Sequence, residues 1–132
     1  MMNEKKGRES PLSVAMKIGE EAAQRGFDWE DLQGPLAKLR EEIDELAEVL
    51  TREEGMKRAE EELGDILFSV VNVARHLGCD PEVALARTNA KFQRRLELVF
   101  QQVKAAGKEP EEVGIEELEA HWQKTKGLET EK

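Results

Sequence analysis

Apolar residues recur every three or four positions along most of this chain, which is the spacing of helices that bury one face. No stretch alternates polar and apolar residues as a half-buried strand does, and no internal repeat is present. The pattern therefore predicts an all-α fold. Helices are expected over five segments, at about 11–25, 35–53, 56–77, 81–105 and 115–126.

Start signals support two of these boundaries. Ser10-Pro11 and Asp80-Pro81 each place a capping side chain before a proline at the first helical position. Residues 1–9 are largely polar or charged and lack apolar periodicity, so we predict a disordered lead-in there. Residues 10–132 are predicted to form a single domain, because a chain of 132 residues is long enough for one core.

The second and third predicted helices each carry a continuous apolar stripe, and we expect them to pack through these stripes. The stripe of the second helix contains Leu36, Leu39, Ile43, Leu46 and Leu50. That of the third contains Met56, Ala59, Leu63, Ile66, Leu67, Val70, Ala74 and Leu77. The third helix is apolar over more than half of its circumference, which one small subunit cannot bury. We therefore predict a homodimer or higher homo-oligomer with four-helix-bundle cores.

Charge and composition narrow the function classes. The formal net charge is -9, and charged residues make up 37% of the chain. This balance argues against nonspecific binding to nucleic acid or to an anionic membrane, and it requires a cation wherever phosphate binds. Cys79 is the single cysteine, and no apolar run suits a signal peptide or a membrane span, so we expect a cytoplasmic protein.

Two pairs of carboxylates with the same spacing border the apolar stripes. Glu42 and Glu45 form one pair, Glu62 and Asp65 form the other, and both project to the same side of their stripes. If the helices pack side by side, these carboxylates meet at one rim, where Mg²⁺ or Mn²⁺ would relieve their repulsion. Solvated acidic helix faces explain the same spacing, so spacing alone leaves both interpretations open.

Gly64 stands inside the second carboxylate pair, in the sequence EELGD. A glycine in a helix interior costs roughly 1 kcal/mol relative to alanine. We expect Gly64 to permit a close approach of another backbone, which would favour the metal interpretation.

The fourth predicted helix adds cationic and amide side chains. Lys91 and Arg95 lie one turn apart and suit phosphate oxygens, although pairing with the acidic excess is the simpler explanation of these two residues alone. Asn89 falls within the apolar stripe of this helix, where a buried amide needs hydrogen-bond partners. His76 and His121 lack the Glu-x-x-His spacing of di-iron bundles, which argues against a redox metal.

The local sequences EEIDEL, EELGDILFSVVNVARHLG and NAKFQRRLE, in this order, resemble the MazG family of nucleoside triphosphate pyrophosphohydrolases. This family belongs to the all-α NTP pyrophosphatase superfamily. The resemblance covers approximately residues 12–126. Longer family members have two catalytic domains in tandem, and we expect one in this chain. It implies Mg²⁺-dependent hydrolysis of nucleoside triphosphates to the monophosphate and pyrophosphate.

The resemblance also implies roles for individual residues. The metal ligands and catalytic carboxylates would be Glu42, Glu45, Glu62 and Asp65, whereas Glu41 and Glu61 project away from that edge. Phosphate and the rest of the substrate would be contacted by Lys91, Arg95 and Asn89.

Three further residues complete the expected substrate site. Lys38 projects to the same flank of its helix as Glu42, so we expect a further phosphate contact from it. Phe27 and Trp29 precede this helix and would stack on the nucleobase, with packing in the core as an equal alternative.

Other functions fit parts of the pattern. A narrower pyrophosphohydrolase of the same superfamily would act on dUTP, dCTP or phosphoribosyl-ATP, and house-cleaning of the nucleotide pool is one role open to the broader enzyme. A non-catalytic helical assembly module with solvated acidic faces is the alternative from a different class. It predicts no stabilisation by Mg²⁺.

Overall fold

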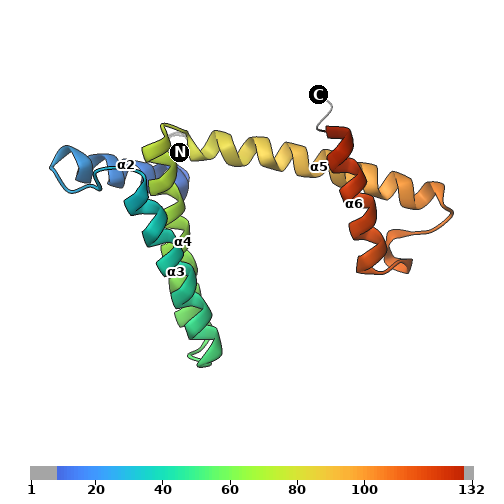
Figure 1. Ribbon diagram of the computed structural model, residues 1–132, viewed down its shortest axis with the longest axis horizontal. Helices are drawn as coiled ribbons and strands as arrows, with labels where there is room; N and C mark the ends of the chain where they lie inside the picture. The colour runs from blue at the N-terminus through green and yellow to red at the C-terminus, as the bar shows by residue number, and fades with distance from the viewer. Residues whose placement is uncertain (1–8, 130–132) are drawn as a thin grey trace, which may run out of the picture. The chain divides into compact units, whose positions relative to one another are not determined.

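A computed structural model describes residues 9–129 of the chain (Figure 1). Its helices are α2 (Pro11–Gln24), α3 (Gln33–Thr51), α4 (Met56–Leu77), α5 (Pro81–Ala105), the 3₁₀ helix η1 (Pro110–Glu112) and α6 (Ile115–Glu129). The residues described contain no strand, so the predicted all-α fold is confirmed, and α4 and α5 have the predicted bounds. No helix in this part of the chain is long and apolar enough to cross a membrane.

The chain divides into two compact units between Ala84 and Leu85. The first unit contains α2, α3, α4 and the first residues of α5, and the second contains the remainder of α5 with η1 and α6. The single domain expected over residues 10–132 stays a prediction. The predicted lead-in lies outside the described residues except for Glu9.

The first unit consists of a helical hairpin and one further helix. α3 and α4 lie side by side and antiparallel, and α2 packs against α4 (Figure 1). The Ser10 side chain accepts a hydrogen bond from the Ser13 backbone N–H at 3.1 Å, so the predicted N-cap of α2 is confirmed. The Ser13 hydroxyl donates to Glu82 at 3.2 Å, which fixes the start of α2 to the start of α5.

The contact between α3 and α4 is centred on the acidic edge of the predicted apolar stripes rather than on their middle. The stripe centres, Ile43 and Leu63, are each 49% exposed. The expected packing is therefore wrong by about 100° of rotation on each helix. Two packed helices bury a narrower arc of each helix surface than these stripes span. In this hairpin the buried arc is the acidic edge of each stripe. We call the buried residues of this contact the α3–α4 seam: Pro35, Glu42, Val49, Glu62 and Ser69.

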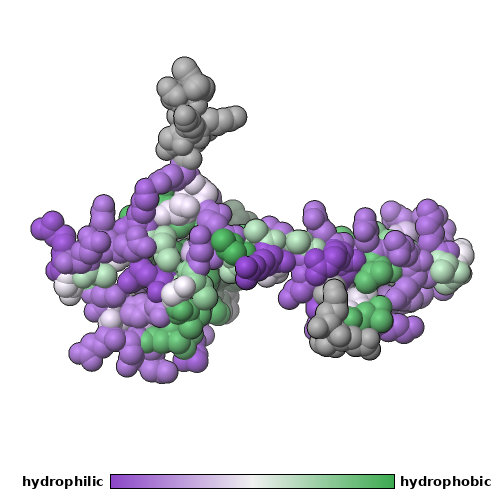
Figure 2. All heavy atoms as spheres, turned by 90° about the horizontal axis from the view of Figure 1, so that it is seen from above, coloured by the Kyte–Doolittle hydropathy of each residue, from purple (hydrophilic) through white to green (hydrophobic). Residues whose placement is uncertain are grey.

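Much of the two stripes remains on the surface as one apolar face. Its exposed fractions range from 42% at Val70 to 80% at Met56. Figure 2 shows that apolar residues on the side it presents gather in patches. Contiguous apolar surface of this kind marks an interaction surface. We define the apolar face as Ile43, Leu50, Met56, Leu63, Leu67, Val70 and Leu77.

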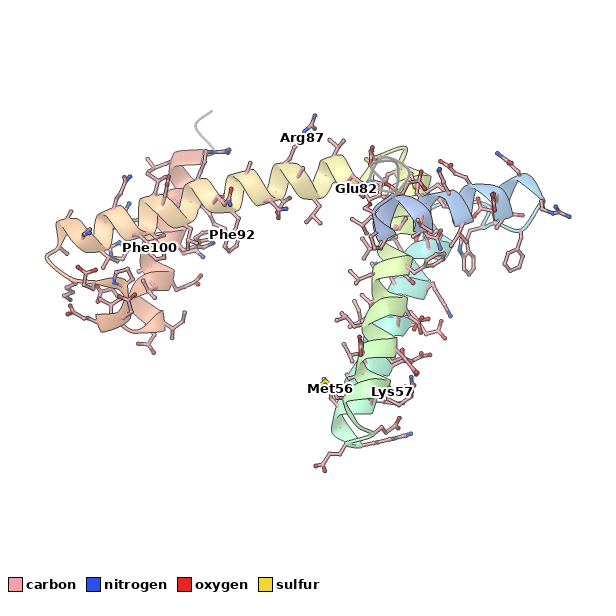
Figure 3. All side chains as sticks on the ribbon, turned by 180° about the vertical axis from the view of Figure 1, so that it is seen from behind. Met56, Lys57, Glu82, Arg87, Phe92 and Phe100 are labelled. Atoms are coloured by element: carbon pink, nitrogen blue, oxygen red, sulfur yellow. The ribbon has the colours of Figure 1, made fainter. Side chains whose placement is uncertain are left out.

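In the second unit α6 packs on the later turns of α5. Phe92 and Phe100 are two of the aromatic side chains of α5 (Figure 3). The ring of Trp122 on α6 lies against Phe92, with the ring centroids 4.6 Å apart. Val99 and Val103 are buried, as their place in the α5 stripe predicts. Asn89 lies earlier on α5 and is exposed, so the expected buried amide is wrong. Leu85, in the first turns of the same stripe, is also half-exposed.

Gly64 does not provide the close approach that we expected of it. A Cβ added there would meet nothing within 4 Å outside its own helix and chain neighbours. We predict that Gly64→Ala raises the free energy of unfolding by about 1 kcal/mol, because it removes a helix-interior glycine without a clash. Urea unfolding without metal measures this. A loss of stability would show that another surface packs against Gly64.

Candidate metal centre

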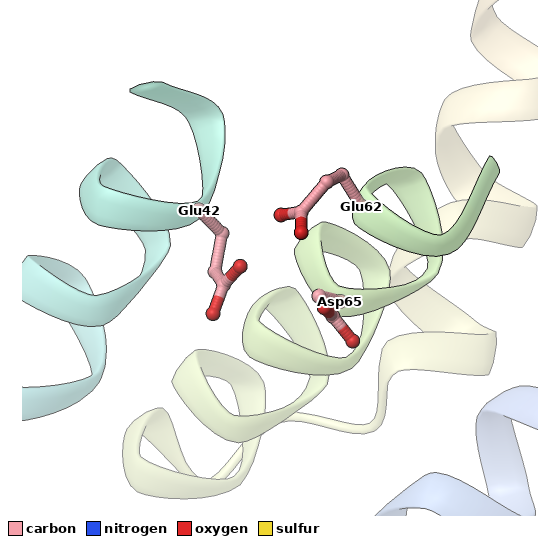
Figure 4. Close-up of side chains that lie close together, drawn as sticks. All are labelled: Glu42, Glu62 and Asp65. Atoms are coloured by element: carbon pink, nitrogen blue, oxygen red, sulfur yellow. The ribbon is translucent and has the colours of Figure 1, made fainter. Parts of the chain in front are cut away.

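Three of the four predicted carboxylates converge across the α3–α4 seam. Glu42 of α3 and Glu62 of α4 extend toward one another, and Asp65 lies one turn further along α4 (Figure 4). One carboxylate oxygen of each lies within 4.8 Å of the others. Glu42 and Glu62 are 6% and 5% exposed, whereas Asp65 is exposed. The seam thus buries two acids and leaves the third accessible.

Glu45 stands apart from this cluster. It lies one turn after Glu42 and is partly exposed, and it is absent from the group of converging oxygens. Burial raises the pKa of Glu45, and the charges of Glu42 and Glu62 raise it further. The anionic form of Glu45 is therefore disfavoured beside the other two. Its role as a metal ligand stays a prediction.

Two cations balance the buried acids. Lys38 Nζ lies 3.2 Å from Glu42 Oε2, and Arg58 Nη2 lies 3.0 Å from Glu62 Oε2. The hydrogen bond from Arg58 lowers the pKa of Glu62, so this carboxylate is held in its charged form. Sequence reasoning missed Arg58, although its place four residues before Glu62 is the spacing of a helical ion pair.

The remaining oxygens of the two buried acids suit a metal ion. Glu42 Oε1 and Glu62 Oε1 are buried and have no hydrogen-bond partner. A buried carboxylate oxygen without a partner is costly, and in native structures such groups are normally paired or coordinate a metal. The donors at this point are all carboxylate oxygens, which Mg²⁺ and Mn²⁺ prefer. The residues present therefore fit a hard divalent cation.

A pocket of about 550 Å³ opens beside this cluster within the first unit. Glu42, Asp65 and Lys38 line one part of it, and aromatic side chains line another. Phe27 is 82% exposed and Trp29 is 45% exposed, so the structure favours a pocket wall over the core for both. The remaining wall comes mainly from Ile18, Gly19, Ala22, Pro35, Phe68, Ser69, Asn72 and Arg75.

The predicted substrate residues of α5 lie in the second unit. Asn89 and Lys91 are exposed on this helix. The Arg95 guanidinium lies 5.7 Å from the centroid of the Trp122 ring, and its Nε is buried without a hydrogen-bond partner. The aromatic contact holds the cation on the surface of the second unit. The substrate roles of all three residues stay predictions.

A helical hairpin with carboxylates in its seam, beside a pocket with an aromatic wall, defines an all-α protein with the donor set of a divalent-metal site. The family model described as MazG nucleotide pyrophosphohydrolase domain matches residues 30–100, and the chain belongs to this family. The match spans α3, α4 and most of α5. The resemblance seen in the sequence is thereby confirmed.

Curated relatives agree with this assignment. The chain is 43% identical over 116 residues to the nucleoside triphosphate pyrophosphohydrolase/pyrophosphatase MazG of Thermotoga maritima, over 88% of this chain and 44% of the relative. It is equally identical to the nucleoside triphosphate pyrophosphohydrolase of Escherichia coli K12, over 87% and 44%. The uncharacterized protein YabN of Bacillus subtilis matches at 41% over 68 residues, 52% of this chain and 14% of the relative. The chain thus spans under half the length of these relatives.

Proposed function

We propose that this protein hydrolyses nucleoside triphosphates to the monophosphate and pyrophosphate, with Mg²⁺ as cofactor and Mn²⁺ as a substitute. The observation that carries the proposal is the pair of partnerless buried oxygens on Glu42 and Glu62, beside Asp65 at the pocket wall. Membership of the MazG family supports the reaction class. The names of the relatives in Thermotoga maritima and Escherichia coli support the same substrate class.

The carboxylates would hold the divalent metal ion, and the positively charged side chains would contact the phosphates. Glu42, Glu62 and Asp65 supply the nearest oxygens, with Glu45 as the fourth proposed ligand. A divalent cation bound there would neutralise phosphate charge and make a bound water more acidic. Lys38 donates to Glu42 and also lines the pocket, so its ammonium group can exchange that carboxylate for a phosphate oxygen.

The rest of the substrate would extend from the acidic part of the pocket to its aromatic part. Phe27 and Trp29 offer ring faces for stacking on a nucleobase. Lys91 and Arg95 are proposed to stabilise the leaving pyrophosphate, and Asn89 to contact the substrate. Aromatic ring faces stack on any nucleobase. We therefore propose a broad substrate specificity with a house-cleaning role, rather than specificity for a single nucleotide such as dUTP or dCTP.

The apolar face supports self-association. It lies on the opposite flank of the α3–α4 hairpin from the pocket-lining Asp65, because Leu63 and Leu67 project about 160° and 200° from Asp65 on α4. Two hairpins joined through this face would form a four-helix core, which is the reason to propose a homodimer. The exposed free thiol of Cys79 suits a reducing cytoplasm, where we propose that the protein acts.

A panel of nucleoside triphosphates tests the proposed function. Normal and modified ribo- and deoxyribonucleotides are incubated with the protein, with and without Mg²⁺, and the products are separated by ion exchange. We expect equal amounts of monophosphate and pyrophosphate, formed only with the metal. Stepwise release of orthophosphate would contradict the cleavage point. No turnover of any triphosphate would favour the assembly module.

A further inference from the structure

A partly buried charge cluster ties the loop that carries Phe27 and Trp29 to α4. Asp28 of this loop accepts two hydrogen bonds from Arg75 of α4, at 2.9 and 3.0 Å. His76 Nε2 lies 3.0 Å from the same carboxylate. The Asp28–Arg75 pair joins segments that are 47 residues apart in the chain. We call Asp28, Arg75 and His76 the loop clasp.

The loop clasp differs from the ordinary surface ion pairs of this chain. The side chains of Asp28, Arg75 and His76 are 23%, 13% and 11% exposed. The hydrogen bonds from Arg75 hold the pKa of Asp28 well below its usual range, so the carboxylate stays charged. A two-pronged contact between a guanidinium and a carboxylate fixes direction as well as distance. The clasp therefore holds the loop backbone in one place.

Two glycines, one on α2 and one on α3, allow side chains in and next to the clasp to pack directly on the helix backbones. A Cβ on Gly34 would lie 2.5 Å from the Trp29 ring, so this indole rests on the α3 backbone. A Cβ on Gly19 would lie 2.7 Å from Arg75 Nε, so the guanidinium passes directly over α2. Neither contact tolerates a larger residue without movement. Trp29, which follows Asp28 in the aromatic wall, is thus placed by packing on α3 next to the clasp.

The clasp also fixes the orientation of an amide in the pocket wall. Arg75 Nη2 donates to Asn72 Oδ1 at 3.1 Å. Arginine offers only donors, so the amide turns its oxygen to Arg75 and keeps its nitrogen for another acceptor. Asn72 and Arg75 both line the pocket.

We propose that the loop clasp is a positioning device for the base-binding part of the pocket, with Asp28 and Arg75 as its positioning residues. The backbone N–H of Phe27 donates to Ala22 at the end of α2, and Trp29 rests on Gly34 of α3, but only the clasp ties this loop to α4 by side-chain hydrogen bonds among those described. The clasp would set substrate affinity rather than the chemistry at the carboxylates. This inference rests on the proposed function.

Steady-state kinetics separates these two effects. We expect Asp28→Ala to raise KM for the best triphosphate about tenfold or more and to change kcat less than about threefold. Arg75→Lys keeps the positive charge but loses the two-pronged hydrogen bond to Asp28. We therefore expect a KM between those of the wild-type protein and Asp28→Ala. Glu30→Gln removes one negative charge from the same loop at an exposed position and is the matched control, with wild-type constants expected.

A second readout tests loop placement without turnover. Trp29 and Trp122 are the two tryptophans, so a Trp122→Phe background reports Trp29 alone. We expect Asp28→Ala to increase acrylamide quenching of Trp29 at least twofold, and Glu30→Gln to leave it unchanged. Asp28→Asn, which keeps the shape of the side chain, replaces Asp28→Ala if circular dichroism shows that the latter is unfolded.

The outcomes distinguish the inference from the proposed function. Unchanged quenching of Trp29 in the Asp28 variants would overturn the clasp, whatever the activity. A fall in kcat at constant KM would overturn its assignment to affinity. If the wild-type protein cleaves no triphosphate, the proposed function fails and the inference about affinity fails with it, while the quenching result still decides whether the clasp places the loop.

Discussion

Glu62→Gln is expected to lower pyrophosphate release at least about 1,000-fold and to abolish stabilisation by Mn²⁺. The glutamine keeps the shape of the side chain but removes the negative charge from a carboxylate with a buried, partnerless oxygen. In the wild-type protein we expect Mn²⁺ to bind the folded state and to raise Tm by several degrees at saturating metal. Thermal unfolding with and without Mn²⁺ measures the binding, and product release measures the chemistry.

Glu61→Gln is the matched control for this experiment. Glu61 is adjacent in the chain, is exposed, and pairs with the same Arg58 at 3.1 Å. It lies outside the converging carboxylates, so activity and the Mn²⁺ effect should both persist in this variant. Equal losses in the two variants would indicate a general effect of charge. A Tm that still rises with Mn²⁺ in Glu62→Gln would remove Glu62 from the metal site.

Local signals were sufficient to predict the helices. The cap at Ser10, the prolines at the first helical positions and the glycine after α4 are decided by residues a few positions apart. The carboxylates were predicted for the same reason, since the spacing of Glu62 and Asp65 fixes their relative direction on one helix. Family resemblance added the order of the motifs, which periodicity cannot supply.

The position of the α3–α4 seam could not be predicted in the same way. Periodicity shows which side of a helix is apolar, but it does not show which part of that side meets the neighbouring helix. Arg58 was predictable in principle from its distance to Glu62 along α4. Gly19 offered a signal too, because a glycine inside a helix suggests a close approach, and that approach occurs at Gly19 rather than at Gly64.

Long-range pairing accounts for the other omissions. Asp28 lies in a loop and Arg75 at the far end of α4, and no spacing rule relates residues 47 positions apart. From the sequence, either residue alone would be predicted to be an ordinary surface charge, because 37% of the chain is charged. A single sequence contains the partners but not the pairing. The sequence therefore left two interpretations of Phe27 and Trp29, which were stacking on a nucleobase and packing in the core.

Leu67→Glu is expected to convert the proposed homodimer into a monomer of 15.0 kDa. Leu67 lies near the middle of the apolar face and is 50% exposed, so the substitution creates no buried charge within one subunit. In a two-fold dimer the new carboxylate occurs on both copies of the same surface, where it loses water and meets its own repeat. We expect the dissociation constant to rise at least about 100-fold. Sedimentation velocity over a range of concentrations measures it.

Ala37→Glu adds the same charge elsewhere on α3 and should leave the proposed dimer intact, because Ala37 projects about 120° around the helix from Ile43 of the apolar face. A wild-type protein that sediments as a monomer would contradict the proposed assembly. Dissociation by both variants would place the interface elsewhere.

The apolar face also gives a physical reason to expect a partner. Covering half-exposed leucine and valine side chains removes apolar surface from water, and this stabilises any complex that buries them. We propose a second copy of this chain as that cover, because both copies would present the same spacing of apolar side chains to each other.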